Sequence, residues 1–567
     1  MHSLRRFLVD YDMAMLRALA ESRGVSLDTN VQAEAVDRLA AALAEPLSVR
    51  AALARLSPEA LEALAALARA GGRLRVPQFA RTYGQIRPVG PGRLVREALW
   101  RKPESPAEEL WYAGLIGRGF ADEGGGPGEF VFLPDEILAL LPAPDPGRPT
   151  FPLGTVPPPA GPDRGAPSLV RDLFAYLVYL HGHDVRPYAD GRLGRRDTAA
   201  LLRRMVGGSQ RRLDLVRHLA ARLGLAARQG HLLRLEAAAA KAWLTATPAE
   251  QLAVLQNAWR SDPTWMDLCH VPGLHCDDAG GWLASYDPVA AREAFLDLLA
   301  QCPPDAWWTV NSFVAAVKET HPDFQRPDGD YESWYVREAG SGDYLSGFGS
   351  WDAVEGRLIR DLLGGVLSWL GVVRVAPGGE CRLAEAGLRF LGLPAPPAGE
   401  VTPGPITVRP DLCVEVPGPG DLYTRFQLER FADLKDEDPC VYSLSAAGLG
   451  RALGRNVQVE QILAFLSQAA GGNLPANVAG QLRLWAGRFG QVELEEVVVL
   501  RTRSERALKE LSVLPETRAY VTRRLSPVTA LVRKEDLPAL RRALQALGFL
   551  LPRDEADDPD LPHHQPG

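Results

Sequence analysis

The first 140 residues alternate apolar and polar positions with the period of amphipathic helices. Apolar residues recur every three or four positions in VQAEAVDRLAAALAEP, in SPEALEALAALARAGG and in PAEELWYAGLI, and Ser57 is a natural N-cap for the second segment. Two short apolar runs then flank the glycine-rich turn of RGFADEGGGPGEFVFLP, a pattern typical of a β-hairpin. The pattern therefore predicts several packed helices followed by a hairpin.

The same order recurs twice further along the chain. SLVRDLFAYLVYLHG, TAALLRRMV with Asp197 as its cap, and QRRLDLVRHLAARLG with Ser209 as its cap precede the hairpin LAARQGHLLRLE. PVAAREAFLDLLAQC, WTVNSFVAAVKE and WDAVEGRLIRDLLGGVLSWLG then precede a hairpin in GVVRVAPGGECRL. Helices followed by a hairpin have the order of a winged helix. We predict three winged-helix-like units, in a chain that is mainly α with small β-hairpins.

Two proline-rich runs interrupt the helical pattern, LPAPDPGRPTFPLGTVPPPAGPDRGAPS and LPAPPAGEVTPGPITVRP. Proline fixes φ and removes a backbone donor, so such runs are predicted as linkers. The predicted division is a helical, winged-helix-like region at 1–140, a linker at 141–168, an arginine-rich winged-helix module at 169–270, a third winged-helix-like module at 285–392, a linker at 393–405, an α+β domain at 406–551 and an acidic, solvated tail at 552–567.

The 567 residues carry 63 Lys and Arg against 70 Asp and Glu, a net charge of −7, so any basic surface must be local. Six scattered cysteines fit a reducing compartment, and no disulfide is expected. Asp10 and Asp12 stand where a signal peptide needs its apolar core, and no later run approaches the roughly 20 apolar residues of a membrane span. A cytoplasmic protein without membrane contact is predicted.

Basic charge is concentrated between Gly191 and Leu235, where eleven arginines face only two aspartates. A helix over Ser209–Leu223 places Val216, Leu219 and Leu223 on one side and Arg211, His218 and Arg222 on the other, flanked by Arg217 and Asp214. The third helix of a helix-turn-helix enters the major groove, so this polar face indicates DNA binding. The predicted phosphate contacts are Arg203, Arg204, Arg211, Arg212, Arg217 and Arg222.

A solvated arginine-rich face is the alternative, since charge runs are often simply solvated, and winged helices also bind proteins. The six lysines are outnumbered by arginines throughout the chain, so genomic base composition is a further source of arginine.

The motifs of nucleotide-driven motors and of serine hydrolases are absent. No lysine follows a glycine, which removes the phosphate-binding P-loop, and no G-x-S-x-G nucleophile elbow occurs. We predict no catalytic residue, no cofactor and no small-molecule substrate.

One cluster, DLCHVPGLHCDD, gathers residue types that bind metals. Cys269, His270, His275 and Cys276 stand around a Pro-Gly turn, followed by Asp277 and Asp278. Sulfur and imidazole are zinc ligands, although the spacing is not that of a known finger or ribbon. Small buried cysteines and surface histidines are the favoured alternative, which leaves metal binding open here.

The C-terminal region from Ile406 to Leu551 carries a series of motifs in a fixed order. They are Pro410-Asp411 on a strand, Tyr442, Leu444 and Ser445 at a helix entry, the helix from Ile462 to Leu466, Leu474-Pro475 before the tryptophan helix, and Gly490 and Val492 in a closing strand. A region with these motifs resembles the N-terminal domain of XPB-type repair and transcription helicases. It also resembles bacterial helicase-associated proteins that carry this module without the motor, after winged-helix regions.

Within this region, LPANVAGQLRLWAGRFGQVEL spaces Val478, Leu482, Trp485 and Phe489 as a helical core stripe. Gly490 is then expected to end the helix, and Val492 to start a strand. The stretch is predicted as a packing element without catalytic residues.

The resemblance implies protein docking and association with DNA helicases, and it transfers no catalytic residue. A comparable eukaryotic subunit docks onto the XPB helicase and stimulates it. The leading prediction is a non-catalytic DNA-associated accessory protein that docks onto a helicase or XPB-like partner in repair or transcription. A protein-interaction scaffold without nucleic-acid binding is the alternative, and a metal-dependent enzyme at Cys269–Asp278 is the third.

Overall fold

The computed structural model describes residues 3–122, 127–141, 151–160, 168–206, 208–397, 404–418, 421–492 and 496–549. Roughly half of these residues are helical, and the strands form several small antiparallel sheets. The chain divides into two compact units. Unit 1 comprises Met1–Pro405, Val416–Arg430 and Asp438–Cys440, and unit 2 comprises Ile406–Glu415, Phe431–Glu437 and Val441–Gly567.

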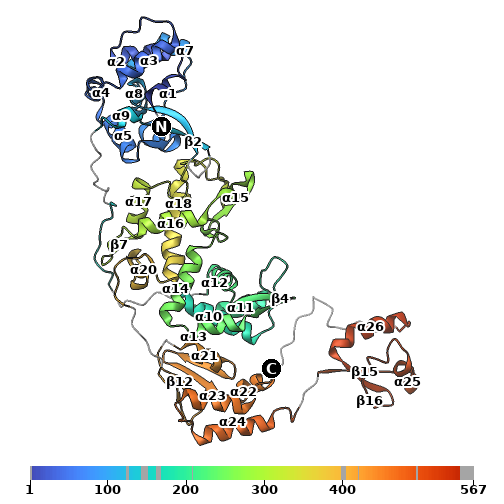
Figure 1. Ribbon diagram of the computed structural model, residues 1–567. Coiled ribbons are helices and arrows are strands. Elements are labelled where there is room, and N and C mark those ends of the chain that lie inside the picture. Colours follow the sequence, from blue (N-terminus) through green and yellow to red (C-terminus); the bar gives the residue numbers. More distant parts are fainter. Residues whose placement is uncertain are drawn as a thin grey trace. The chain divides into compact units, whose positions relative to one another are not determined.

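The N-terminal part of unit 1 is a helical bundle with a small sheet (Figure 1). Ser57 caps α5 as predicted, since its hydroxyl accepts a hydrogen bond from the Ala60 nitrogen at 3.2 Å. The predicted hairpin is confirmed as β2 and β3, while its turn lies outside the described residues; the sheet order is β1-β3-β2. The elements are α1 (Leu4–Leu8), α2 (Met13–Arg23), α3 (Gln32–Leu43), α4 (Pro46–Leu53), α5 (Pro58–Arg69), β1 (Arg73–Arg75), α6 (Val76–Tyr83), α7 (Pro91–Glu97), α8 (Pro106–Tyr112), β2 (Gly117–Asp122), β3 (Pro127–Phe132) and α9 (Asp135–Leu138).

The arginine-rich region follows the predicted order of three helices and a hairpin. Two capping predictions differ in detail. Gly194, not Asp197, precedes the second helix, and Ser209 holds the N-cap position of the third without a side-chain hydrogen bond. The elements are α10 (Leu169–Gly182), α11 (Arg195–Arg204), α12 (Gln210–Arg222), β4 (Ala226–Gln229), β5 (Leu232–Leu235), α13 (Ala237–Thr245), α14 (Pro248–Arg260), a 3-10 turn η2 (Asp267–His270) and β6 (Leu274–Cys276).

The next region also ends in the predicted hairpin, β9 and β10, to which β7 adds a third strand. Its elements are α15 (Trp282–Ser285), α16 (Pro288–Leu299), β7 (Trp308–Thr309), α17 (Val310–Thr320), β8 (Val336–Glu338), α18 (Trp351–Asp361), a π-helical segment η5 (Leu362–Val366), α19 (Leu367–Trp369), β9 (Val373–Val375), β10 (Glu380–Leu383) and α20 (Glu385–Phe390). Strand β8 pairs with β6, which lies between the two predicted modules. Whether these regions are winged helices stays a prediction.

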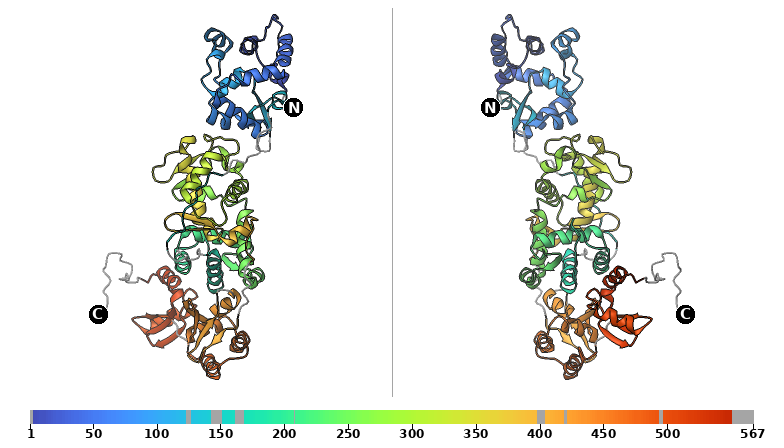
Figure 2. Two further views of the ribbon diagram at one scale, coloured as in Figure 1. Left: turned by 90° about the vertical axis from the view of Figure 1, so that its left-hand side faces the viewer. Right: turned by 90° about the vertical axis from the view of Figure 1, so that its right-hand side faces the viewer.

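One hydrophobic core joins these two regions. It contains buried residues from Leu169 to Leu388, and it also includes Leu422 and Phe426 of α21 (Leu422–Glu429). Figure 2 shows the helices of this part from two further sides. The described part of the first proline-rich linker packs there too, because the Val156 nitrogen donates to the Trp307 oxygen at 2.7 Å.

Residues 404–492 contain a four-stranded sheet of order β11-β12-β14-β13, and residues 496–549 a three-stranded one of order β15-β17-β16. The predicted tail at 552–567 lies outside the described residues. The elements are β11 (Thr407–Val408), β12 (Cys413–Val416), β13 (Ala432–Glu437), β14 (Cys440–Leu444), α22 (Ala446–Leu453), α23 (Val459–Ala469), α24 (Ala476–Arg488), β15 (Val497–Arg501), α25 (Glu505–Val513), β16 (Arg523–Ser526), β17 (Thr529–Arg533) and α26 (Leu537–Ala546).

Two predictions for the tryptophan helix α24 are corrected. Val478 and Leu482 are buried and Trp485 is partly buried, but Phe489, which directly follows the helix, is 50% exposed, so the core stripe ends before Phe489. Gly490 does follow the helix with φ of +76°, yet Val492 is in a bend and is exposed, and the next strand begins at Val497. The helix leaves the core before its end.

Among the helices of the described residues, none combines the length and the apolar character that crossing a bilayer requires.

Candidate nucleic-acid interface

Helix α12 is the helix that the sequence analysis assigns to the DNA groove, and its apolar side packs inward through Val216 and Leu219. Arg212 lies on this buried side as well. Its side chain is 3% exposed, and its Nε donates to the carboxylate of Asp172 on α10. Asp172 is fully buried and accepts a second hydrogen bond from the Val206 nitrogen at 2.7 Å. Arg212 therefore ties α12 to α10, and no phosphate can reach it.

Arg211 is directed at α18 rather than at solvent. Both of its terminal nitrogens donate to the carboxylate of Asp361, and its guanidinium lies 5.3 Å from the ring centroid of Trp369. Burial raises the pKa of Asp361 to about 6, and Arg211 opposes that rise. The carboxylate is thus charged at neutral pH, and it holds the guanidinium in a two-point ion pair.

The side chains of the last turns of α12 form hydrogen bonds with backbone carbonyls of neighbouring segments and with the turn after α14. Arg217 donates to the carbonyl of Gly191, and Arg222 donates to the carbonyl of Ser261 at 2.9 Å. His218 places its Nε2 2.5 Å from a carboxylate oxygen of Asp262. The polar face of α12 is positive, as the helical pattern predicts, but its charges are directed at the protein's own groups.

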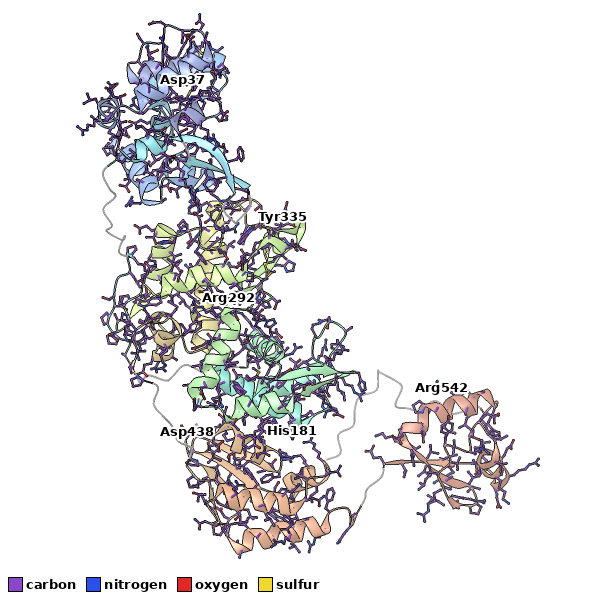
Figure 3. The ribbon with its side chains drawn as sticks, viewed as in Figure 1. Asp37, His181, Arg292, Tyr335, Asp438 and Arg542 are labelled. Carbon is purple, nitrogen blue, oxygen red and sulfur yellow. A yellow bond between two sulfur atoms is a disulfide. The ribbon has the colours of Figure 1, made fainter. Side chains whose placement is uncertain are left out.

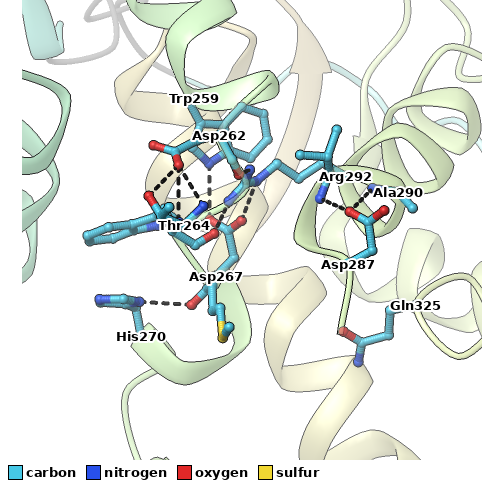
Figure 4. A network of polar contacts seen from close by, with 12 residues as sticks. Trp259, Asp262, Thr264, Asp267, His270, Asp287, Ala290, Arg292 and Gln325 are labelled. Atoms are coloured by element: carbon cyan, nitrogen blue, oxygen red, sulfur yellow. Dashed lines mark hydrogen bonds and ion pairs between the residues drawn. The ribbon is translucent and has the colours of Figure 1, made fainter. Parts of the chain in front are cut away.

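Asp262 lies at the centre of a polar network that contacts α12 through His218, and Figure 4 shows Asp262 beside Thr264. Its carboxylate is fully buried and accepts hydrogen bonds from the nitrogen and the hydroxyl of Thr264, at 2.8 and 2.7 Å, besides the contact with His218. Burial alone would raise the pKa of Asp262, but the hydrogen bonds from Thr264 and His218 outweigh it and lower the pKa to about 2. Asp262 is therefore a permanent anion that fixes the C-terminal half of α12.

A second buried carboxylate, Asp267, extends this network. It accepts hydrogen bonds from the indole nitrogens of Trp259 and Trp265, at 3.0 and 3.1 Å, and from Nε of Arg292 at 2.6 Å. Arg292, labelled in Figures 3 and 4, is 3% exposed and also donates to backbone carbonyls of this turn. These charged groups satisfy one another, so the network positions elements and offers no reactive side chain.

The metal-type cluster next to this network is arranged differently from the prediction. Cys269 and Cys276 form a disulfide, with their Cα atoms 5.4 Å apart, so the expectation of no disulfide is wrong. No disulfide was expected because the six cysteines are scattered, although the Pro272-Gly273 turn that brings η2 beside β6 is a local signal. The ring of His270 stacks on Trp265 at 3.7 Å, and Asp277 pairs with Arg337. In the described ranges, no three His, Cys, Asp or Glu side chains are grouped as metal ligands would be.

The exposed arginines of this region are on α11. Arg195, Arg196, Arg203 and Arg204 are all exposed. Eight residues advance an α-helix by about 80° beyond two full turns, so the four side chains spread over about half of the circumference of α11. The guanidinium of Arg204 lies 5.9 Å from the ring centroid of Tyr179. Within the described chain, Arg195 and Arg203 have no carboxylate partner.

The structure thus separates the six predicted contacts into two groups. Arg203 and Arg204 are exposed, while Arg211, Arg212, Arg217 and Arg222 bond to the protein itself. Arg195 and Arg196 were not among the predicted contacts, although both belong to the eleven arginines between Gly191 and Leu235.

The C-terminal positions that carry the helicase resemblance have structural roles. Asp411 accepts a hydrogen bond from the Cys413 nitrogen at 3.2 Å and closes the turn between β11 and β12. Tyr442 and Leu444 are buried on β14, and the hydroxyl of Ser445 caps α22 by accepting from the Gly448 nitrogen at 3.0 Å. These residues therefore shape the fold of the domain.

Comparison with protein families finds a match in the same C-terminal region. Residues 406–526 match the model of a family described as "helicase conserved C-terminal domain". The match supports a helicase-associated C-terminal domain in this chain. No curated protein matches the chain.

Proposed function

We propose that the protein is a non-catalytic accessory protein that binds DNA and docks onto a helicase or XPB-like partner. The observation that carries the proposal is the match of residues 406–526 to a helicase domain family. The exposed arginines of α11 supply the DNA-contacting surface. In this proposal the protein is cytoplasmic, and any ATP-driven unwinding comes from the partner, since the sequence offers no P-loop.

Residues 169–235 are proposed to act as a winged-helix module that neutralises phosphates through α11. Guanidinium groups that lack an internal carboxylate can exchange bound water and counterions for a phosphate at low cost, whereas Arg211 or Arg212 would first have to abandon a buried carboxylate. Among the predicted contacts, Arg203 and Arg204 are therefore favoured, and Arg195 and Arg196 join them.

Fluorescence anisotropy with a labelled DNA duplex tests this role at two salt concentrations. Replacing Arg195 and Arg203 with Ala should weaken binding at low salt and reduce the slope of log affinity against log salt by about 2, because each lost phosphate contact removes about one unit. The matched control is Arg38→Ala with Arg50→Ala, two exposed arginines of the N-terminal region. Equal losses in both double variants, or no binding at low salt, would refute DNA binding by α11.

Docking is tested by affinity purification of the full chain from its native host, with partners identified by mass spectrometry. A helicase that is recovered with the full chain, and is lost when residues 406–549 are deleted, supports docking through the matched region. Recovery that persists after the deletion places docking elsewhere.

A protein-interaction scaffold is the second candidate, and the internal bonding of the α12 arginines favours it. It predicts partner recovery without measurable DNA binding. The third candidate, a metal-dependent enzyme at Cys269–Asp278, has lost two of its ligands, because the two sulfur atoms are bonded to each other.

A further inference from the structure

Residues 496–549 form a small subdomain whose helices cover one face of its three-stranded sheet. Its core contains Leu511 of α25, Leu540 and Leu544 of α26, and Val532 of β17, and Val498 and Leu500 pack against this core. Because side chains alternate along a strand, Val497, Val499 and Arg501 of β15 point to the opposite face.

This opposite face is apolar at its centre and basic at its margins. Val499 is 51% exposed and pairs with Leu531, which pairs in turn with Arg523 of β16. Val497 pairs with Arg533, and Arg501 lies beyond Val499 on the same strand. In the part of the chain that the structure describes, Arg501 and Arg523 have no carboxylate partner. We call this surface the open sheet face; it consists of Val497, Val499, Arg501, Arg523, Leu531 and Arg533.

The charge of the subdomain is opposite to that of the chain. Residues 496–549 hold eleven Lys and Arg against six Asp and Glu, a net charge of +5, whereas the whole chain has −7. The segment that follows α26 has the complementary charge. PRDEADDPDLPHHQPG carries five acidic residues and one arginine, and the acidic residues are Asp554, Glu555, Asp557, Asp558 and Asp560.

We propose that the acidic segment Asp554–Asp560 occupies the open sheet face of this same subdomain and shields its arginines. The inference goes beyond the proposed function and does not depend on it. Phe549 is the last described residue, and an extended chain covers about 3.3 Å per residue, so the acidic residues lie within about 16 to 36 Å of it along the chain. A domain of this length has a radius of gyration of about 10 Å, so the segment is long enough to pass around the sheet edge.

Two physical effects favour this occupant. Covalent attachment keeps the acidic residues at an effective concentration in the millimolar range, which an unlinked acidic partner does not reach at ordinary protein concentrations. Leu561 follows the acidic residues directly, and it supplies an apolar side chain for the centre formed by Val499 and Leu531.

Cysteine labelling measures the coverage of the open sheet face. Val499→Cys is introduced into the full chain, and its rate of reaction with an uncharged maleimide is compared with the rate in a chain that ends at Leu551. Background reaction is low, because Cys302, Cys381, Cys413 and Cys440 are buried and the other two cysteines are joined. At low salt the full chain should react at least about threefold more slowly, as expected for a weak contact at millimolar effective concentration.

The controls separate this contact from other causes of slow labelling. Val513→Cys, on the last residue of α25 and 73% exposed, should react equally in both chains. Replacing Asp554, Asp557 and Asp558 with Asn should restore fast labelling of Val499→Cys, as should salt near 1 M. Val497→Cys, on the same face, serves as a second probe in case the first variant misfolds.

Equal labelling rates in the full and shortened chains overturn the proposal. Protection that increases with protein concentration also overturns it, since the occupant would then be a second copy of the chain.

Discussion

Arg212 and Asp172 place two opposite charges inside the core of unit 1. Removing an ion from water costs several kcal/mol, and the partner compensates for that cost only while both charges are present. Arg211 and Asp361 form a similar ion pair that is less deeply buried, because their side chains are 17% and 11% exposed. The cost of losing one partner should therefore be smaller for this pair. At the scale of single residues, replacing either arginine should therefore lower the stability of the fold, whether or not a ligand binds.

Replacing Arg212 with Met should lower the free energy of unfolding by about 3 to 5 kcal/mol, because Asp172 is left buried without its counter-charge. Urea unfolding followed by tryptophan fluorescence measures the loss. The double variant Arg212→Met with Asp172→Leu should recover most of it. Arg203→Ala, an exposed control on α11, should change the free energy by less than about 0.5 kcal/mol. A single Met variant as stable as the wild type would contradict the structural role of the pair.

Asp262 makes a prediction about pH. Its pKa is lowered from 3.8 to about 2, so its contribution to stability is present above about pH 4 and is lost as the pH falls through 2. The shift corresponds to about 2 kcal/mol. The stability difference between the wild type and Asp262→Asn, measured by urea unfolding, should shrink between pH 4 and pH 2 relative to its value at pH 5. A difference that is unchanged at pH 2.5 would show that the charge of Asp262 is unimportant.

At the scale of elements, local patterns predicted much of the structure. The hairpins β2–β3, β4–β5 and β9–β10 were predicted correctly, because a glycine or a short polar turn between apolar runs is a local signal. The helices α10, α12 and α16 were also predicted correctly, because their apolar residues recur every three or four positions. The cap of α5 at Ser57 also follows from local chemistry.

The predictions that failed depend on contacts between distant segments. The sequence of α12 shows which arginines share a face, but not that Asp361, 150 residues away, lies opposite Arg211. Likewise, the apolar spacing of α24 does not show where the neighbouring core ends, so Phe489 was placed inside it. The disulfide between Cys269 and Cys276 is a different case, because the two cysteines are only seven residues apart and the Pro272-Gly273 turn between them is visible in the sequence.

Helix α22 provides a test of packing in the region that matches the helicase family. A Cβ atom at Gly448 would lie 2.5 Å from the backbone oxygen of Phe431, whereas at Gly450, in the same helix, the nearest atom is 4.0 Å away. Gly448→Ala should therefore destabilise this region by about 1 to 3 kcal/mol. Gly450→Ala should be neutral or stabilising by up to about 1 kcal/mol, since alanine is the better helix former. Thermal unfolding that ranks the two variants in the opposite order would contradict this packing.

At the scale of the whole molecule, the hydrophobic core that joins the two central regions of unit 1 is larger than either predicted module. It joins residues of 169–270 with residues of 285–392, and it includes Leu422 and Phe426 of α21. A fragment of residues 169–270 would expose apolar side chains that are buried in the full chain.

The fragment 169–270 should therefore unfold without a cooperative transition, whereas the fragment 151–430 should unfold cooperatively. The second fragment keeps α21, and each large apolar side chain it buries contributes about 1.5 to 3 kcal/mol. Circular dichroism during heating distinguishes the two. Cooperative melting of 169–270 would show that the module is independent.

A chain that ends at Pro405 is a further comparison, and it should melt below the 151–430 fragment because it lacks Leu422 and Phe426.

The separation of exposed arginines on α11 from bonded ones on α12 also affects how this protein can change over generations. A substitution on α11 alters the surface charge and leaves the interior intact, so affinity for an anionic ligand can drift in small steps. A substitution at Arg211 or Arg212 alters the interior first, and a variant chain would be removed by misfolding before its binding could be selected. Natural diversity in binding strength should therefore accumulate on α11, while the arginines of α12 should vary together with their aspartate partners.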